Sequence, residues 1–178
     1  MSASVPSASW PSVSSFLEFA KSDMKANPGN PKVRAILLGL RICQVLMGDR
    51  VNPRVASLPF VAAYRIITEF FLGIEIPPKT MIGAGLCVYH GFGLVINDHC
   101  VIGQNVTVRN GVTIGNRKAG GPVPCIGNGV DIGAGAIILG GIKLGDGCRV
   151  GAGSVVLHSV SVGATVVGNP ARPLDKLS

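Results

Sequence analysis

The stretch "IGAGAIILGGIKLGDGCRVGAGSVV", residues 132–156, decides the fold because a large aliphatic side chain returns in it at every sixth position. The repeat is carried by Ile132, Ile138, Leu144, Val150 and Val156. An α-helix brings a side chain back to the same face about every 3.6 residues, so helices are excluded here. A six-residue period with glycine corners instead predicts a left-handed parallel β-helix, in which three flat faces make one triangular coil of about 18 residues.

The same period extends well beyond this stretch. Further aliphatic residues occupy multiples of six at Ile96, Ile102, Val108, Ile114, Ile126 and Val162. Two positions before these sites stand smaller side chains, namely Val106, Val112, Val130, Ala136, Cys148, Ser154 and Val160. The pattern predicts that one large and one small residue point inward per turn, in a mainly β fold of about five coils over residues 80–168, followed by a C-terminal tail over 169–178.

The repeat is interrupted twice. An earlier frame at Ile82, Val88 and Leu94 is offset by two positions from the later one, so an insertion of two lies within "HGFGLVIN", residues 90–97. The aliphatic residue is also missing at Gly120, within "NRKAGGPVPC", where glycine, proline and charge predict an extruded loop.

A different pattern precedes the repeat. Residues 1–31 are rich in Ser, Ala and Pro and are expected to be flexible, although residues 14–26 have the composition of a short helix. Residues 32–79 form an α-helical region, because "KVRAILLGLRICQVLMG" and "VASLPFVAAYRIITEFFLGI" predict two packed helices broken around "DRVNP". Core or subunit packing is the usual role of such helices, and peripheral contact with a membrane is the less common alternative.

Composition limits the function. The 178 residues suffice for one domain, and the net charge of +7 is scattered, with nine basic and five acidic residues before Thr80. With only 5% aromatic residues, the chain does not look like a stacking platform for bases, and a phosphorylated small molecule fits the scattered charge as well as nucleic acid does. Five widely spaced cysteines and no signal peptide or membrane-length apolar run predict a reducing, cytoplasmic location.

His90 is the first candidate for chemistry. The interior of such a prism admits only aliphatic and small side chains, so this histidine must point outward, beside glycines that let a ligand approach closely. An imidazole can accept a proton from a hydroxyl at physiological pH. His99 and His158 are interpreted as solvated surface residues.

Several motifs resemble a known family. They are "YRIITEFFLGIEI", "YHGFGLVIN", "RNGVTIGNR", the opening stretch of repeats and "VVGNPAR", spread from Ser57 to Leu174. Together they resemble the hexapeptide-repeat acyltransferases, which include serine acetyltransferases, and in particular the colanic-acid type of exopolysaccharide O-acetyltransferase. The resemblance implies transfer of an acetyl group from acetyl-CoA, without a metal, at a site between neighbouring prisms of a homotrimer.

The resemblance also implies roles for individual residues. His90 matches the catalytic histidine, and Glu75 stands where the family has a partner carboxylate, at the family's spacing from that histidine. Such a carboxylate would fix the imidazole tautomer and stabilise imidazolium. The expected acetyl-CoA contacts are Gly115, Ala134 and Ala152 along a groove, Arg172 near the phosphates, and Lys118 and Lys143 as further cations. The weaker candidates for acceptor binding are Asn97, Arg109 and Asn110.

Two departures bear on the acceptor. Tyr89 stands where serine acetyltransferases carry Asp, and the loop "GGPVPC" lacks the histidine that they have there. The missing groups would help to hold a small amino acid, so a hydroxyl of a saccharide, in an exopolysaccharide or its precursor, is the expected acceptor. Serine O-acetylation for cysteine biosynthesis is the alternative.

Three further alternatives remain. A carbonic anhydrase on this fold would need three histidines converging on zinc, and the spacing of the three in this chain does not fit. Cys125 could serve as a nucleophile, but direct attack by the acceptor needs no acyl-enzyme. A non-catalytic β-helix assembly subunit would explain the repeats without needing His90 or Glu75.

Overall fold

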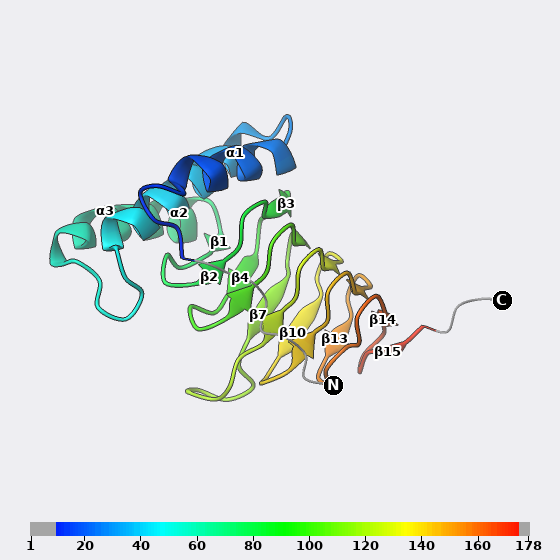
Figure 1. Cartoon of the computed structure of the whole chain (residues 1–178). Coiled ribbons are helices and arrows are strands. Elements are labelled where there is room, and N and C mark those ends of the chain that lie inside the picture. The colour runs from blue at the N-terminus through cyan, green and yellow to red at the C-terminus, as the bar shows by residue number, and fades with distance from the viewer. Residues whose placement is uncertain (1–9, 175–178) are drawn as a thin grey trace.

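The computed structural model describes residues 10–174 as a triangular prism of stacked coils with a helical layer at one end (Figure 1). The coils are built almost entirely from parallel strands, and the sheet with one strand from each coil contains five of them. The predicted fold class is confirmed: this is a mainly β solenoid of about five turns that matches a left-handed parallel β-helix and is preceded by helices.

Three sheets form the faces of the prism. The first face contains β1 (Ile74–Glu75), β4 (Leu94–Ile96), β7 (Thr113–Gly115), β10 (Ile137–Leu139) and β13 (Val155–Val156). The second contains β2 (Met81–Ile82), β5 (Val101–Ile102), β8 (Cys125–Ile126) and β11 (Lys143–Leu144). The third contains β3 (Cys87–Tyr89), β6 (Thr107–Arg109), β9 (Asp131–Ile132), β12 (Arg149–Val150), β14 (Thr165–Val167) and β15 (Arg172–Pro173).

Strand register confirms both predicted interruptions. In a regular coil the chain returns to the same face after three hexapeptides, as in the pairing of Cys125 with Lys143. The first coil is longer by two positions, since Ile82 pairs with Ile102, and the extra positions lie in the turn after β3. The coil that pairs Ile102 with Ile126 is longer by six, and its extra positions form the loop 116–124, which projects from the prism in yellow-green (Figure 1).

The inward positions follow the predicted period with one exception. The aliphatic residues of the frame from Ile96 to Val156 and the small residues two positions earlier are buried. The period predicts that Val162 also points inward, but this residue is 73% exposed. The reason is a shortened coil: Leu144 pairs with Val160, two positions before the regular partner. Val160, predicted as the small inward residue, therefore takes the inward place of the large one.

The helical layer contains α1 (Phe16–Ala26), α2 (Pro31–Met47), the 3₁₀ turn η1 (Val55–Ser57), α3 (Leu58–Arg65) and the π-helical segment η2 (Ile66–Phe71). The expectation of a flexible segment over residues 1–31 is therefore wrong for residues 16–26, and the short-helix alternative is confirmed. Residues 1–9 of that segment lie outside the described residues. α2 begins where the side chain of Asn30 accepts a hydrogen bond from the amide of Val33 at 3.2 Å.

Polar side chains of α1 and α2 cover the open edge of the first coil. The buried guanidinium of Arg41 binds Asp23 at 2.8 Å and also donates to the carbonyls of Ile82 and Gly83, both at 2.8 Å. Asp23 in turn accepts from the amide of Gly85 at 2.9 Å, and the side chain of Asn27 exchanges hydrogen bonds with the backbone at the start of β3. These side chains satisfy backbone groups that a preceding coil would otherwise pair. This explains why α1 is ordered despite its polar sequence.

The opposite end of the prism closes differently. β15 folds back antiparallel to β14, with Arg172 opposite Val167. Within the described residues, no helix combines the length and apolar character needed to cross a membrane.

Candidate functional site

Two edges of the prism carry the predicted site residues. We call the edge where the chain passes from the third face to the first the His90 edge; it contains residues 90–93, 110–112, 133–136 and 151–154. The edge where the chain passes from the first face to the second is the loop edge; it contains residues 97–100, 116–124, 140–142 and 157–159.

His90 begins the irregular turn of the first coil. It directly follows β3, its side chain is exposed as predicted, and its φ of 64° lies in the left-handed region. This conformation costs a residue with a Cβ about 1–2 kcal/mol and persists only where surrounding contacts enforce it. One such contact is a hydrogen bond of 3.0 Å from Nζ of Lys32, in the first turn of α2, to the carbonyl oxygen of His90. Backbone strain of this kind is typical of functional sites.

Glu75 lies on the outer surface of β1, opposite Val95 and thus two positions past the end of this turn. Gly73, two positions before Glu75, accepts a hydrogen bond from the amide of Gly93 at 2.7 Å, which joins the entry of β1 to the His90 turn. Glu75 is half-buried; the hydrogen bond to Glu69 and, more weakly, the negative charge of Glu75 raise the pKa of Arg65. In the described chain no hydrogen bond or ion pair joins Glu75 to His90, so their partnership stays a prediction.

Three predicted residues do stack with His90 along one edge. The amide of Gly135 donates to the carbonyl of Asn110 at 2.9 Å, and the amide of Gly153 donates to that of Ala134 at 2.8 Å. Asn110, Ala134 and Ala152 therefore occupy successive levels of the His90 edge.

The surface of this edge is open enough for an extended chain to lie against it. A Cβ placed on Gly135 or Gly153 would meet no atom within 4 Å, so the space over these residues is open. Small residues at regular levels let an extended chain lie against the backbone and bond to its exposed groups.

Other predicted residues lie on the loop edge or away from both edges. Gly115 ends β7 and faces Asn97, whose Cβ lies 3.7 Å from a Cβ built at Gly115. The side chain of Asn97 is occupied by a turn, since it accepts from the amide of His99 at 3.0 Å. Lys118 lines a pocket of about 410 Å³ between the loop and Gly140. Lys143 is exposed on the second face, where β11 pairs with β8.

Arg172 lies at the far end of the third face. β15 and β3 are its two outermost strands, separated by five strand spacings of about 4.8 Å, so Arg172 and His90 are about 24 Å apart along the prism. Arg172 lines a pocket of about 320 Å³ together with His158 and Pro173. A donor that touches both His90 and Arg172 must therefore run most of the length of the prism.

Arg109 has partners that the sequence did not indicate. Its guanidinium pairs with the carboxylate of Asp131 on the next coil and donates to the carbonyl of Ile132 at 3.0 Å. It also lies over the ring of Tyr89, 5.4 Å from the ring centre. The hydrogen bond to Asp131 raises the pKa of Arg109. Arg109 thus holds Tyr89, the residue before His90, against the third face.

Sequence reasoning missed Lys32, because 58 residues separate it from His90 and nothing in the sequence indicates that α2 crosses the first coil. The buried pair of Asp23 and Arg41 had a weak signal, namely an arginine that interrupts the apolar residues between Ala35 and Met47 of α2.

The alternative chemistries find little local support. Burial raises the pKa of the Cys125 thiol, which weakens it as a nucleophile. His99 is exposed and pairs with the adjacent Asp98, with 2.6 Å between Nδ1 and the carboxylate. Among residues 10–174, no cluster of three or more His, Cys, Asp or Glu side chains is arranged to hold a metal ion.

Comparisons with known proteins agree on the family. Residues 126–158 match the family of bacterial transferase hexapeptide repeats, and residues 93–117 match the hexapeptide repeat of succinyl-transferase. The protein WcaB of Escherichia coli (strain K12), named as a putative colanic acid biosynthesis acetyltransferase, is 45% identical over 154 residues, which are 84% of this chain and 95% of WcaB.

Solved structures of serine acetyltransferases are also similar. The soybean apoenzyme has a TM-score of 0.75 at 36% identity, covering 90% of this chain and 69% of its own. A serine acetyltransferase in complex with CoA has a TM-score of 0.72 at 28% identity, and the match covers 91% of this chain and 70% of that enzyme's chain. Repeats, relatives and fold together show that this chain belongs to the hexapeptide-repeat acyltransferase family, as an acetyltransferase.

Proposed function

We propose that the protein transfers the acetyl group of acetyl-CoA to a hydroxyl of a saccharide, within an exopolysaccharide or its precursor, with His90 as the general base. The observation that carries this proposal is the exposed, strained His90 at the head of an edge of small residues. The similarity to a protein named for colanic acid biosynthesis over 84% of the chain supports a saccharide as acceptor.

In this mechanism an imidazole nitrogen of His90 accepts the proton of the saccharide hydroxyl as its oxygen attacks the thioester carbonyl. The tetrahedral intermediate collapses, the carbon–sulfur bond breaks, and imidazolium returns the proton to the departing thiolate, so that CoA leaves as the thiol. No acyl-enzyme forms, and His90 ends in its starting state. General-base catalysis of this kind contributes typically about 10²–10⁴-fold to the rate.

We propose that Glu75 supports His90 by pairing with the second ring nitrogen when substrates are bound. Its position on β1, the strand whose entry is bonded to the His90 turn through Gly73 and Gly93, supports this role. A negative charge there would hold the tautomer that leaves the catalytic nitrogen free, and would stabilise imidazolium.

The donor would lie along the His90 edge against Ala134 and Ala152, with its phosphates toward Arg172. The separation of about 24 Å between the two ends requires an extended donor. Gly115, Lys118 and Lys143 lie outside this edge and would contact the same donor only if a neighbouring prism faced it. We therefore propose a homotrimer in which each site lies between two chains. Five free cysteines support a reducing, cytoplasmic location.

Serine O-acetylation is the second candidate, favoured by the similarity to serine acetyltransferase structures. Tyr89 is held by Arg109 at the position before the proposed base, where an aromatic ring offers a stacking surface for a sugar ring. This arrangement favours the saccharide.

The test is an acetylation screen with acetyl-CoA, in which release of CoA thiol is measured with free oligosaccharides and with serine. We expect turnover with an oligosaccharide, and a loss of about 10²–10⁴-fold in kcat for His90→Ala at unchanged acetyl-CoA affinity. His99→Ala, which changes another exposed histidine that lines none of the pockets described above, is the control and should be neutral. Efficient turnover of serine, or wild-type rates from His90→Ala, would contradict the proposal.

A further inference from the structure

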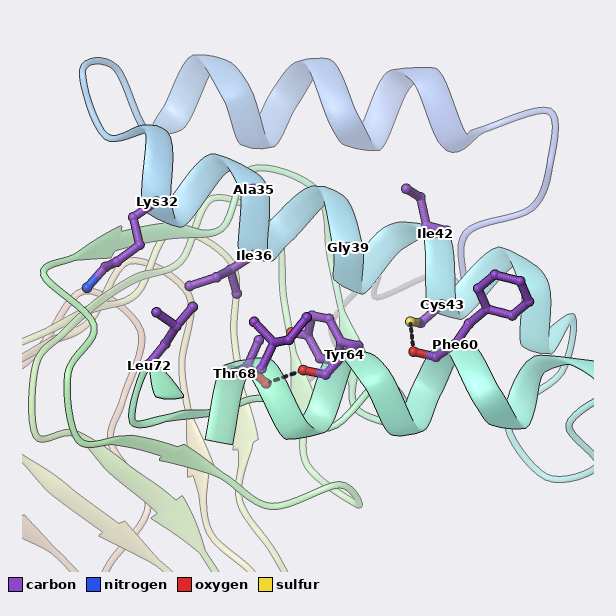
Figure 2. A pocket seen from close by; sticks show the side chains of 11 residues that line it. Lys32, Ala35, Ile36, Gly39, Ile42, Cys43, Phe60, Tyr64, Thr68 and Leu72 are labelled. Atoms are coloured by element: carbon purple, nitrogen blue, oxygen red, sulfur yellow. Dashed lines mark hydrogen bonds between the residues drawn. The ribbon is translucent and has the colours of Figure 1, made fainter. Parts of the chain in front are cut away.

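The helical layer contains a pocket that the acetyl-transfer mechanism does not use. It has a volume of about 420 Å³ and opens between α2 and the continuous run of α3 and η2 (Figure 2). We call it the helix pocket. Small-molecule sites commonly have volumes of about 300–1,000 Å³, so it is large enough to hold a ligand.

The wall of the helix pocket is apolar. Cys43 and Thr68 bear polar groups there, but the thiol donates to the carbonyl of Phe60 at 3.7 Å and the hydroxyl donates to that of Tyr64 at 3.0 Å. Tyr64 lies beneath the pocket surface, since the residue is only 8% exposed. The remaining wall residues are Ala35, Ile36, Gly39, Ile42, Ile67 and Leu72. Apart from the buried Tyr64 hydroxyl, which has no hydrogen-bond partner in the described chain, and Lys32 at one end, the side chains of the wall are apolar or already bonded. The occupant that fits most of the pocket is therefore a hydrocarbon.

One end of the helix pocket is charged. Lys32 is the single charged residue of the lining, and Figure 2 shows it beside Leu72 at one end, with Phe60 and Ile42 at the other. The ammonium of Lys32 is 3.0 Å from the carbonyl oxygen of His90. The charged end of the pocket is therefore also the end that adjoins the proposed catalytic turn.

The apolar surface continues from the pocket to that turn. After Leu72 comes Gly73, where a Cβ would lie 2.9 Å from the ring of Phe92, so Phe92 packs over this backbone. Phe92 stands two positions after His90 and is 72% exposed. Phe60 and Ile67 of the pocket are also more than half exposed. Contiguous exposed apolar side chains of this kind mark sites of binding.

We propose that the helix pocket binds the hydrocarbon tail of a lipid-linked saccharide acceptor, whose linking phosphate meets Lys32 while the saccharide reaches His90. The inference rests on the proposed function and names its substrate class. The argument for this occupant is charge complementarity: an apolar pocket with one cation at the end nearest the reacting group matches an anionic amphiphile joined to a sugar. A second copy of the chain covering the pocket is the competing outcome.

The kinetic test compares one oligosaccharide in two forms, free and joined through a phosphate to a farnesyl chain. We expect the linked form to have a kcat/KM at least about tenfold higher, because each buried methylene favours binding. Ile67→Asp should remove most of this advantage while leaving the free form unchanged, because it places a carboxylate against the tail. Ile66→Asp is the matched control, since Ile66 is the adjacent residue, is 50% exposed against 54% for Ile67, and lies outside the pocket lining.

A binding test separates this inference from the proposed function. Farnesyl phosphate and farnesol are titrated into the full chain by calorimetry, and Lys32→Met should weaken farnesyl phosphate about threefold to fivefold while leaving farnesol unchanged. If the linked and free acceptors react equally well, or if Ile67→Asp keeps the advantage of the linked form, the tail site is wrong. If Ile67→Asp instead changes the sedimentation of the protein, a second copy covers the pocket and the proposal is overturned. Failure of acetyl transfer to both acceptors alongside farnesyl phosphate binding would refute the proposed function alone.

Discussion

The ammonium of Lys32 and the carbonyl oxygen of His90 are 3.0 Å apart and joined by a hydrogen bond. This contact ties the first turn of α2 to the turn that holds the imidazole in a left-handed backbone conformation. Lys32 therefore couples the helical layer directly to the proposed catalytic turn.

Lys32→Met should lower kcat with a free oligosaccharide by about threefold to tenfold, because the turn loses the contact that holds His90 in its strained conformation. The KM for acetyl-CoA should not change, since Lys32 lies away from the small residues of the His90 edge. Lys32→Arg keeps a donor and should restore part of the rate. Lys21→Met removes another exposed lysine from the helical layer and serves as the control. A wild-type kcat for Lys32→Met would show that the contact does not position His90.

The buried pair of Asp23 and Arg41 should contribute strongly to stability. Asp23→Ala leaves the fully buried guanidinium without its counter-charge, so the free energy of unfolding should fall by about 3–5 kcal/mol. The comparison is Glu69→Ala, which breaks the more exposed pair with Arg65 and should cost less than about 1 kcal/mol. Urea denaturation of both variants gives the two values. If both variants lost the same free energy of unfolding, burial of the Asp23–Arg41 pair would not increase its contribution to stability.

Alkaline pH should destabilise the protein through its buried thiols. Burial raises the pKa of Cys43 and Cys148 to about 11 and that of Cys100 to about 12. The folded chain therefore holds these protons at a pH where the unfolded chain has released them. The contribution of these thiols to the free energy of unfolding is fully present below about pH 9, the pKa of the thiols in the unfolded chain. It is lost as the pH rises toward 11–12. Urea midpoints measured from about pH 8 to pH 11 should fall, and less steeply for Cys100→Ala than for the wild type. If the urea midpoints of Cys100→Ala and the wild type fell equally steeply with pH, titrating groups other than Cys100 would cause the loss of stability.

Arg172→Ala should weaken acetyl-CoA binding by about tenfold at low salt, because a charge-assisted contact to a phosphate is lost. The side chain is exposed, so the fold should persist. Calorimetry measures the affinity, and Arg149→Ala, which removes another exposed cation of the third face, provides the control. Unchanged affinity would place the donor phosphates elsewhere.

The sequence predicts the prism well because its geometry is local. A six-residue period determines which side chains point inward, and a break in the period at His90 or Gly120 locates an irregular turn directly. Val162 shows the limit of this reasoning: shortening of the preceding turn by two positions moves the inward place to Val160, and no glycine, proline or charge run indicates it.

The site is less predictable because it depends on contacts between distant segments. His90 follows from its place in a break of the repeat, but Lys32 reaches it only through the path of α2 across the first coil. For Arg109 the sequence gives no indication that the next coil supplies Asp131 as its partner. Stacking brings together side chains that stand a whole coil apart in the sequence, and single-residue reasoning does not capture which of them then pair.

The two ends of the prism also affect how molecules can associate. An uncovered coil would be a template on which another molecule adds its own strands, so that prisms would grow end to end into filaments. Asp23, Asn27 and Arg41 occupy the backbone groups at the first coil, and antiparallel β15 breaks the parallel register at the last. Neither end of the prism therefore offers the free backbone groups on which strands of another copy could continue the coils.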